Sequence, residues 1–82
     1  MAKIFHLTVA RVGEKLFDGE VLSVSLPGID GVFEVFAGHE ALISGLAPGE
    51  VRITSSDSQQ HHFSIAEGGI AEISQNQATI LL

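Results

Sequence analysis

The chain has 82 residues, no cysteine and a formal net charge of −6, and these properties already exclude several classes of protein. A polypeptide this short buries only about 60% of the surface that its unfolded form exposes, so we expect one core and one domain, residues 1–82. Without cysteine, neither disulfides nor a thiolate zinc site hold the fold together. The acidic balance argues against nucleic acid or anionic lipid as a partner, because both require clustered lysine or arginine.

Hydrophobic residues make up 45% of the chain and charged residues 17%, which predicts a folded globular domain. No apolar stretch is long enough to span a bilayer. The N-terminal stretch MAKIFHLTVA has one lysine, and His6 and Thr8 interrupt its apolar run. We therefore do not expect a cleaved signal peptide at this end of the chain.

The first predicted element is a β-strand near the N-terminus, where apolar and polar residues alternate. Phe5, Leu7 and Val9 fall on one face of this strand, and His6 and Thr8 fall on the other. We expect the three apolar side chains to face the core.

A second alternating run follows, in which Leu22, Val24 and Leu26 are expected to face the core and Ser23 and Ser25 to face outward. Such alternation is typical of a strand with one buried face. Two later segments show the same pattern, Val51 to Ile53 and His61 to Ala66.

Turn-forming residues separate these runs at short intervals, and the chain contains nine glycines. No window offers a capped helix, since even the segment from Gly38 to Gly49 holds three glycines and a proline. Short strands at this spacing are typical of an all-β sandwich or barrel. At Gly68 and Gly69 we expect two backbones to approach closely at a turn or bulge.

Two histidine motifs suggest metal chemistry, and neither survives inspection. His39-Glu40 opens like the zinc-protease signature HExxH, but the second histidine position is Ile43 and no helix is predicted there. His61 and His62 are adjacent, so on a strand their side chains point to opposite faces. Moreover, no serine lies in a G-x-S-x-G elbow. We predict no catalytic residue, no metal site and no cofactor.

The segment GVFEVFAGHEALISGL holds more apolar side chains than one face of a sheet can cover. In so small a domain, some of them are expected at the surface, where they would mark a protein interface. The alternative is that all of them pack into the core.

Four segments, in this order and spacing, resemble the N-terminal domain of the epsilon subunit of bacterial and chloroplast F-type ATP synthases, whose mitochondrial counterpart is called delta. They are FDGEV (17–21), SLPGIDG (25–31), GHEALISGLAPGEVRI (38–53) and EGGIAEISQNQATIL (67–81). The likeness covers nearly the whole chain. It implies an all-β fold, a flattened β-sandwich of about ten short strands. It also implies a non-catalytic rotor subunit of the central stalk, which couples proton-driven rotation to ATP synthesis.

The resemblance implies two partners, the gamma subunit and the c ring of the synthase. The glycine-histidine turn, the strand after it and the end of the first strand match gamma-facing positions of the family. The expected gamma contacts are Arg11, His39, Glu40, Leu42 and Ser44. The expected c-ring contacts are Asp30, Gly31, Val32, Phe33 and Glu34.

Three departures from the family pattern affect these expectations. The acidic residue of the c-ring loop has moved to Glu34, although alternation places it on the same face as Val32. The usual proline before the glycine-histidine turn is Ala37, which should make that turn more mobile. Family members usually continue into a C-terminal helical hairpin that can brake ATP hydrolysis, so a chain ending at Leu82 is expected to lack that inhibition and any ATP binding by the hairpin.

As part of the synthase, the chain is expected to lie peripherally on the cytoplasmic face of a bacterial inner membrane, or on the stromal face of a thylakoid, without inserting into lipid. Other hypotheses remain. One is a generic β-sandwich protein-binding module, and a glycan-binding form of it lacks an aromatic platform because the chain has no Trp or Tyr. Another is a small metal-dependent hydrolase that would bind zinc through His39, Glu40, His61 or His62.

Overall fold

The computed structural model describes residues 3–82, and its regular structure is entirely β-strand in this part of the chain. Eight strands follow one another: β1 (Phe5–Arg11), β2 (Glu14–Gly28), β3 (Gly31–Phe36), β4 (Leu42–Leu46), β5 (Gly49–Ser55), β6 (Gln60–Ile65), β7 (Gly69–Ser74) and β8 (Gln77–Leu81). The molecule is flattened, with extents of 36 × 24 × 19 Å. Met1 and Ala2, which begin the predicted domain 1–82, lie outside the described residues.

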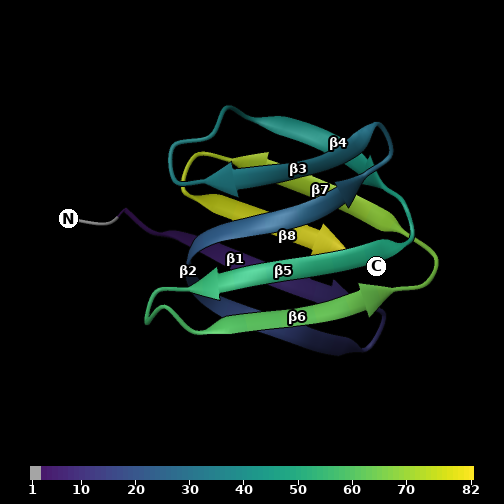
Figure 1. The fold of residues 1–82 in the computed structure, drawn as a ribbon, viewed down its shortest axis with the longest axis horizontal. Helices are drawn as coiled ribbons and strands as arrows, with labels where there is room; N and C mark the ends of the chain where they lie inside the picture. The colour runs from purple at the N-terminus through teal and green to yellow at the C-terminus, as the bar shows by residue number, and fades with distance from the viewer. Residues whose placement is uncertain (1–2) are drawn as a thin grey trace.

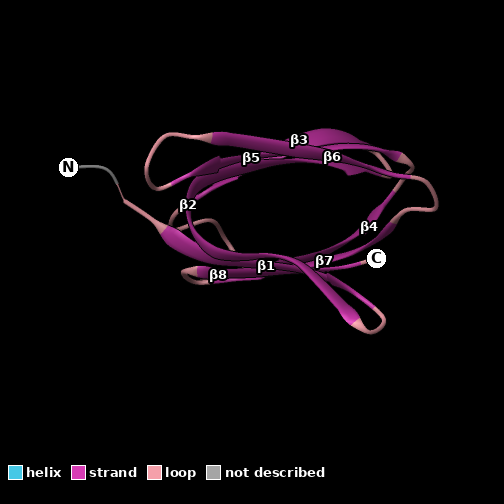
Figure 2. Ribbon diagram, turned by 90° about the horizontal axis from the view of Figure 1, so that it is seen from below, coloured by secondary structure: helices cyan, strands magenta, loops and turns pink. Residues whose placement is uncertain are grey.

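The strands form the two layers of a sandwich, seen face-on in Figure 1 and edge-on in Figure 2. One layer holds β3, the second half of β2, β5 and β6, and the other holds β1, β8, β7 and β4. Neighbours pair in antiparallel fashion except β1 and β8, which are parallel. The predicted all-β flattened sandwich is confirmed.

The described residues form eight strands, slightly fewer than the expected ten or so. The longest of them, β2, is one continuous strand of 15 residues that serves both layers. Its first half pairs with β1, and its second half pairs with β3 and β5 in the opposite layer. The bend of β2 between the layers is visible in Figure 2. At the far end of β2, Gly28 also pairs with Leu46 of β4, so the layers are joined both at the bend of β2 and at its C-terminal end.

The core lies between the two layers and is filled by one face of each strand. Phe5, Leu7 and Val9 are buried, as the alternation of the first strand predicts. Val51 and Ile53 of β5 and Ile65 of β6 are buried in the same way. The wholly buried centre consists of Leu7, Val9, Val21, Val24, Leu26, Val35, Val51, Ile53 and Ile80.

The prediction for the second alternating run is wrong at Leu22. The register between β2 and β5 shifts between Val21 and Ser23, so Leu22 is the extra residue of a β-bulge. Because of this extra residue, both Val21 and Val24 face the core, whereas Leu22 stays partly exposed. A bulge shifts the inward and outward positions by one residue, and the alternation of the sequence does not show where such a shift occurs.

Gly68 and Gly69 lie where two backbones approach closely, as predicted. A Cβ atom on Gly68 would overlap the carbonyl oxygen of Leu46, and one on Gly69 would overlap that of Leu81. Gly68 also has a φ of +80°, a left-handed conformation that favours glycine. These residues let the start of β7 fit closely between β4 and β8.

Candidate interaction surfaces

The outer face of the β1–β8–β7–β4 layer carries exposed apolar side chains that adjoin one another. Ile70 of β7 lies directly opposite Leu81 of β8 on one side and Gly45 of β4 on the other. The side chain of Ile29, from the β2–β3 turn, covers Gly45, because a Cβ on this glycine would overlap the Cδ1 atom of Ile29. Ile43 lies two residues before Gly45 and shares its face.

We call Ile29, Ile43, Ile70 and Leu81 the apolar patch. Their exposed fractions are 68%, 73%, 52% and 56% respectively, so at least half of each residue faces solvent. Single exposed apolar residues are ordinary on protein surfaces, whereas a contiguous group marks a contact with another molecule. The patch is therefore the first candidate for a protein interface on this chain.

The turn between β3 and β4 holds His39 and Glu40, two of the expected gamma contacts. Gly38 reaches a φ of +81° there, and the backbone N–H of His39 donates to the carbonyl of Phe36 at 3.2 Å. The Nδ1 atom of His39 lies 2.8 Å from the carbonyl oxygen of Glu40. Because a carbonyl only accepts, Nδ1 carries the hydrogen, and Nε2 is the nitrogen left for a partner.

Leu42 and Ser44 are two further expected gamma contacts, and both lie on the inward side of β4. Leu42 is half-buried and packs against the core, and the hydroxyl of Ser44 donates to the carbonyl of Gly45 at 3.0 Å. Their neighbour Ile43 points outward. A partner that covers this face would thus meet Ile43 first.

Arg11 lies at the other end of the sandwich from the β3–β4 turn. It ends β1 beside Leu82, whose backbone N–H donates to Ala10, and its Nε is 3.7 Å from a carboxylate oxygen of Glu14. Figure 1 shows the end of β1 and the β3–β4 turn on opposite sides of the molecule. The structure thus places Arg11 at the opposite end of the molecule from His39 and Glu40, whereas the pairing across β8 and β7 puts Ser44 of β4 nearer to the Arg11 end.

The expected c-ring residues occupy the β2–β3 turn and the start of β3. Val32 and Glu34 point outward together, opposite Pro27 and Ser25 of β2, as the alternation predicts. Phe33 points inward and packs against the core. Val32 is 77% exposed, which makes it the most accessible apolar side chain of this segment.

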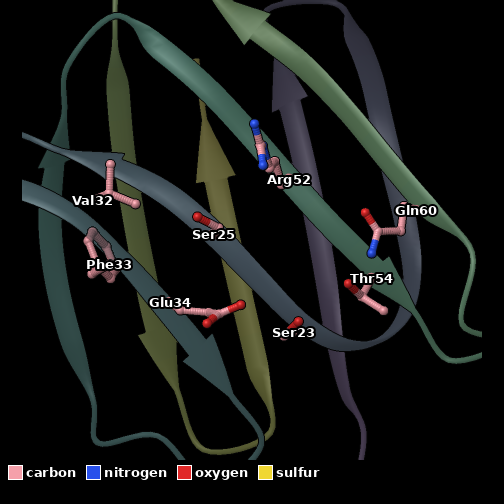
Figure 3. Close-up of a pocket in the computed structure, with 8 residues that line it drawn as sticks. All are labelled: Ser23, Ser25, Val32, Phe33, Glu34, Arg52, Thr54 and Gln60. Atoms are coloured by element: carbon pink, nitrogen blue, oxygen red, sulfur yellow. The ribbon is translucent and has the colours of Figure 1, made fainter.

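Val32 and Glu34 also form one wall of an open hollow of about 440 Å³ on the outer face of the other layer, drawn in Figure 3. Small serines of β2, Ser23 and Ser25, lie at its floor, and Arg52 is among the residues of the opposite wall. Glu34 and Arg52 lie on the two sides of Ser25, because each of them is its partner on a neighbouring strand. The hollow is polar and shallow, in contrast to the apolar patch on the opposite face.

Charged side chains beside the hollow pair with one another. The Nε atom of Arg52 lies 2.6 Å from one carboxylate oxygen of Glu50, and Nδ1 of His62 lies 3.4 Å from the other. The hydrogen bond from Arg52 lowers the pKa of the Glu50 carboxyl below its ordinary value. Glu50 therefore stays ionised at neutral pH, and the positive charge of Arg52 offsets its negative charge.

The adjacent histidines of β6 point to opposite faces, as predicted. The ring of His61 packs edge-on against Phe17 with 5.5 Å between ring centroids, whereas His62 faces Glu50. Among residues 3–82, no group of three or more His, Cys, Asp or Glu side chains converges to hold a metal ion. Nor does this part of the chain contain a helix that could cross a membrane.

A two-layer β-sandwich with an exposed apolar patch on one outer face is the class of domain that offers a candidate surface for protein contacts. The sequence profile of the family described as ATP synthase, Delta/Epsilon chain, beta-sandwich domain matches residues 4–82. The chain therefore belongs to the delta/epsilon family of ATP synthase chains.

Individual relatives agree with this assignment. The ATP synthase epsilon chain of Chlorobium limicola is 42% identical over 79 residues, which cover 96% of this chain and 89% of that one. The epsilon chain of Protochlamydia amoebophila is 40% identical over 78 residues, which cover 95% of this chain but 52% of that one. The chain is thus nearly as long as one relative and about half as long as the other.

Solved structures give the same fold. A chain of the Euglena gracilis mitochondrial ATP synthase, solved as an assembly of OSCP, F1 and c-ring, superposes with a TM-score of 0.86 at 26% identity, covering 99% of this chain and 51% of that one. A chain of the Tetrahymena thermophila enzyme, solved as central stalk and c-ring, gives a TM-score of 0.73 at 17% identity, covering 93% and 60%. The second likeness concerns the fold alone.

Sequence reasoning missed three of the four residues of the apolar patch. Ile29 sits in a turn, where apolar residues carry no periodic signal. Ile70 and Leu81 belong to strands whose facing depends on the pairing of β7 and β8. Ile43 could have been found, because β-alternation anchored on Leu46 places Leu42 and Ser44 inward and Ile43 outward.

Proposed function

We propose that this chain is a non-catalytic rotor subunit in the central stalk of an F-type ATP synthase. In this role it binds the gamma subunit through the outer face of the β1–β8–β7–β4 layer, and the c ring through Asp30 and the first residues of β3, Gly31 to Glu34. It thereby helps to couple proton-driven rotation of the ring to ATP synthesis in the catalytic head. The observation that carries the proposal is the apolar patch on a chain of the delta/epsilon family.

The size of the patch suits a small set of binding anchors. Complete burial of an isoleucine or leucine side chain is worth about 1.5–3 kcal/mol, and at least half of each patch residue is still exposed. Each residue therefore has roughly 1–2 kcal/mol left to contribute to a complex. A few such anchors carry most of the free energy of a typical interface.

The arrangement of the two expected contact regions also supports two partners. β3 runs from Gly31 to Phe36, so the β2–β3 turn with Asp30 and the β3–β4 turn with His39 lie at opposite ends of one strand. The Euglena gracilis chain with this fold was solved in an assembly that includes a c-ring. A domain with contact residues at both ends is suited to link two neighbouring subunits.

The same proposal places the chain peripherally on the membrane, on the cytoplasmic face of a bacterial inner membrane or the stromal face of a thylakoid, held there by the synthase. It assigns the chain no chemistry of its own. The polar residues beside the hollow serve solubility and contact with neighbouring subunits in this scheme. ATP synthesis belongs to the catalytic head.

The first test is whether the purified chain comigrates on size exclusion with a gamma-containing catalytic head from the same organism. Ile70→Asp should abolish comigration, because it removes an anchor and forces an unpaired carboxylate into the interface, lowering the affinity at least about 100-fold. Gln60→Asp is the matched control, since it adds the same charge on β6 of the other layer and should leave binding intact.

Equal behaviour of these two variants would contradict the assignment of the face. Failure of the folded wild-type chain to bind at all would instead favour a protein-binding module with another partner. The c-ring contact is tested by Val32→Cys, a unique thiol because the chain has no cysteine. In the assembled synthase this thiol should crosslink to the c ring, and crosslinking to gamma alone would overturn the placement.

A further inference from the structure

His6 lies between two carboxylates of the neighbouring strand. In the β1–β2 pair, His6 is opposite Glu20, and Thr8 is opposite Asp18. The Nδ1 atom of His6 is 3.1 Å from Oε1 of Glu20, and its Nε2 atom is 2.5 Å from Oδ1 of Asp18. The three side chains are 41%, 49% and 39% exposed, in the order His6, Glu20, Asp18, so solvent protons reach them.

Only the protonated ring satisfies this geometry. An ionised carboxylate accepts hydrogen bonds and cannot donate one, so each ring nitrogen must carry a hydrogen. A neutral imidazole has one N–H, and its other nitrogen would turn a lone pair toward a negatively charged oxygen. The two contacts therefore hold together only as long as His6 is an imidazolium.

The electrostatics of the cluster agree with the geometry. The hydrogen bond to Glu20 and then that to Asp18 raise the pKa of His6 above 6.5. Conversely, the hydrogen bond from His6, followed by the one from Lys15, lowers the pKa of Asp18 below 3.8. These shifts have the directions expected for opposite charges in contact.

The other groups that face His6 complete the charge balance. Lys15 contacts the second oxygen of Asp18 at 3.2 Å, and the Thr8 hydroxyl donates to Asp18 at 3.4 Å. On the other side of β1, β8 contributes no titratable residue, and Gln77 lies opposite His6. Two cationic and two anionic side chains thus balance while His6 is protonated, and one net negative charge appears when it is not.

We propose that His6, Asp18 and Glu20 form a proton-dependent bridge between β1 and β2, which is closed while His6 is protonated and opens when the ring becomes neutral. The bridge lies near the start of β1, far from the Val12-Gly13 turn that connects the two strands. Its opening loosens the end of the strand pair that no turn holds together. This inference does not depend on the proposed function.

The sign of the pH dependence follows from the two shifts. Because the pKa of His6 is raised on folding, the contribution of the bridge is complete below pH 6.5 and is lost as the pH rises through the folded pKa of His6. Because the pKa of Asp18 is lowered, the contribution is complete above pH 3.8 and is lost as the pH falls through the folded pKa of Asp18. The bridge is therefore strongest between these limits.

The test is an NMR titration of the His6 ring in the full chain, combined with amide hydrogen exchange. The His6 midpoint should lie above 6.5 and shift downward in Glu20→Gln, because that change removes an acceptor of the ring. Glu14→Gln is the matched control, since Glu14 is on the same strand but pairs with Arg11, and it should leave the midpoint in place. The protection factors of the Phe5 and Leu7 amides, which correct for the base-catalysed rise of intrinsic exchange with pH, should fall roughly a few-fold across the same midpoint, as expected for an exposed ion pair.

A midpoint at or below 6.5, or one that ignores Glu20→Gln, would overturn the bridge. Unchanged protection factors across the midpoint would overturn its effect on the strand pair. Binding to the gamma-containing head gives a separate readout, because His6 lies on the same outer face as the apolar patch. The pH dependence of that binding above pH 6.5 should disappear in His6→Gln. Absence of binding at every pH would count against the proposed function, and the NMR titration would then decide whether the bridge exists.

Discussion

Gly68→Ala should destabilise the domain far more than Gly13→Ala, although both glycines have left-handed backbones. Their φ angles are +80° and +76°, so alanine is strained to a similar extent at both. The surroundings differ, since a Cβ on Gly13 meets nothing within 4 Å, while one on Gly68 overlaps the carbonyl oxygen of Leu46. The pair thus separates backbone strain from steric collision.

The strain common to both variants is about 1–2 kcal/mol, offset by about 0.4–1 kcal/mol from the lower entropy of the unfolded chain, so Gly13→Ala should cost about 1 kcal/mol. In Gly68→Ala the carbonyl of Leu46 must also move. The peptide between Leu46 and Ala47 is held by the N–H of Ala47, which donates to Pro27 at 2.8 Å. Overpacking of this kind adds about 1–3 kcal/mol, which is a large part of the roughly 4–12 kcal/mol that a domain of this length has in total.

Urea unfolding of the two variants and the wild type gives the free energies directly, and thermal melts give an independent measure. An additional 1–3 kcal/mol corresponds to a melting temperature about 5–20 °C lower for Gly68→Ala than for Gly13→Ala. Equal loss of stability in the two variants would refute the steric argument. It would mean that β4 and β7 accommodate a methyl group where the structure leaves no space for one.

Three further results are expected. Leu42→Asp should unfold the domain because Leu42 packs against the core, whereas Ile43→Asp should fold normally, and circular dichroism melts compare the two. Two equally folded variants would contradict the inward placement of Leu42. The pKa of the Asp57 carboxyl is lowered, chiefly because the Ser55 hydroxyl donates a hydrogen bond to it. In urea unfolding, the wild type should therefore be more stable than Asp57→Asn by an amount that is complete above pH 3.8 and declines below it. A difference that is constant with pH would argue against this hydrogen bond. Excess EDTA should leave the melting temperature unchanged, and a lower value would revive a metal-dependent hydrolase.

Much of the fold could be predicted because alternation with a period of two survives in most strands. β1, β5 and β6 bury the residues that their sequences indicate, Phe63 and Ile65 among them. Prediction failed where local geometry interrupts the period, as at Leu22, since a bulge depends on the register of two strands rather than on the residues of one.

The candidate interface could be predicted only in part. The excess of apolar residues between Gly31 and Leu46 indicated surface exposure, and the structure does expose Val32, Phe36 and Ile43. It could not indicate that residues from three other places in the chain join Ile43. Such a patch is created by strand pairing, which a single sequence does not encode in any local pattern.

β2 belongs to both layers, and this has a mechanical consequence. In a sandwich whose layers touch only through side chains, one layer can slip over the other when a sideways force acts on a single face. Here the backbone of one strand is hydrogen-bonded into the first layer over its early residues and into the second over its late ones. A sideways force on one layer therefore passes through the sheet hydrogen bonds to β2 and is resisted by the backbone of β2 where it crosses to the layer that holds Val32 and Glu34.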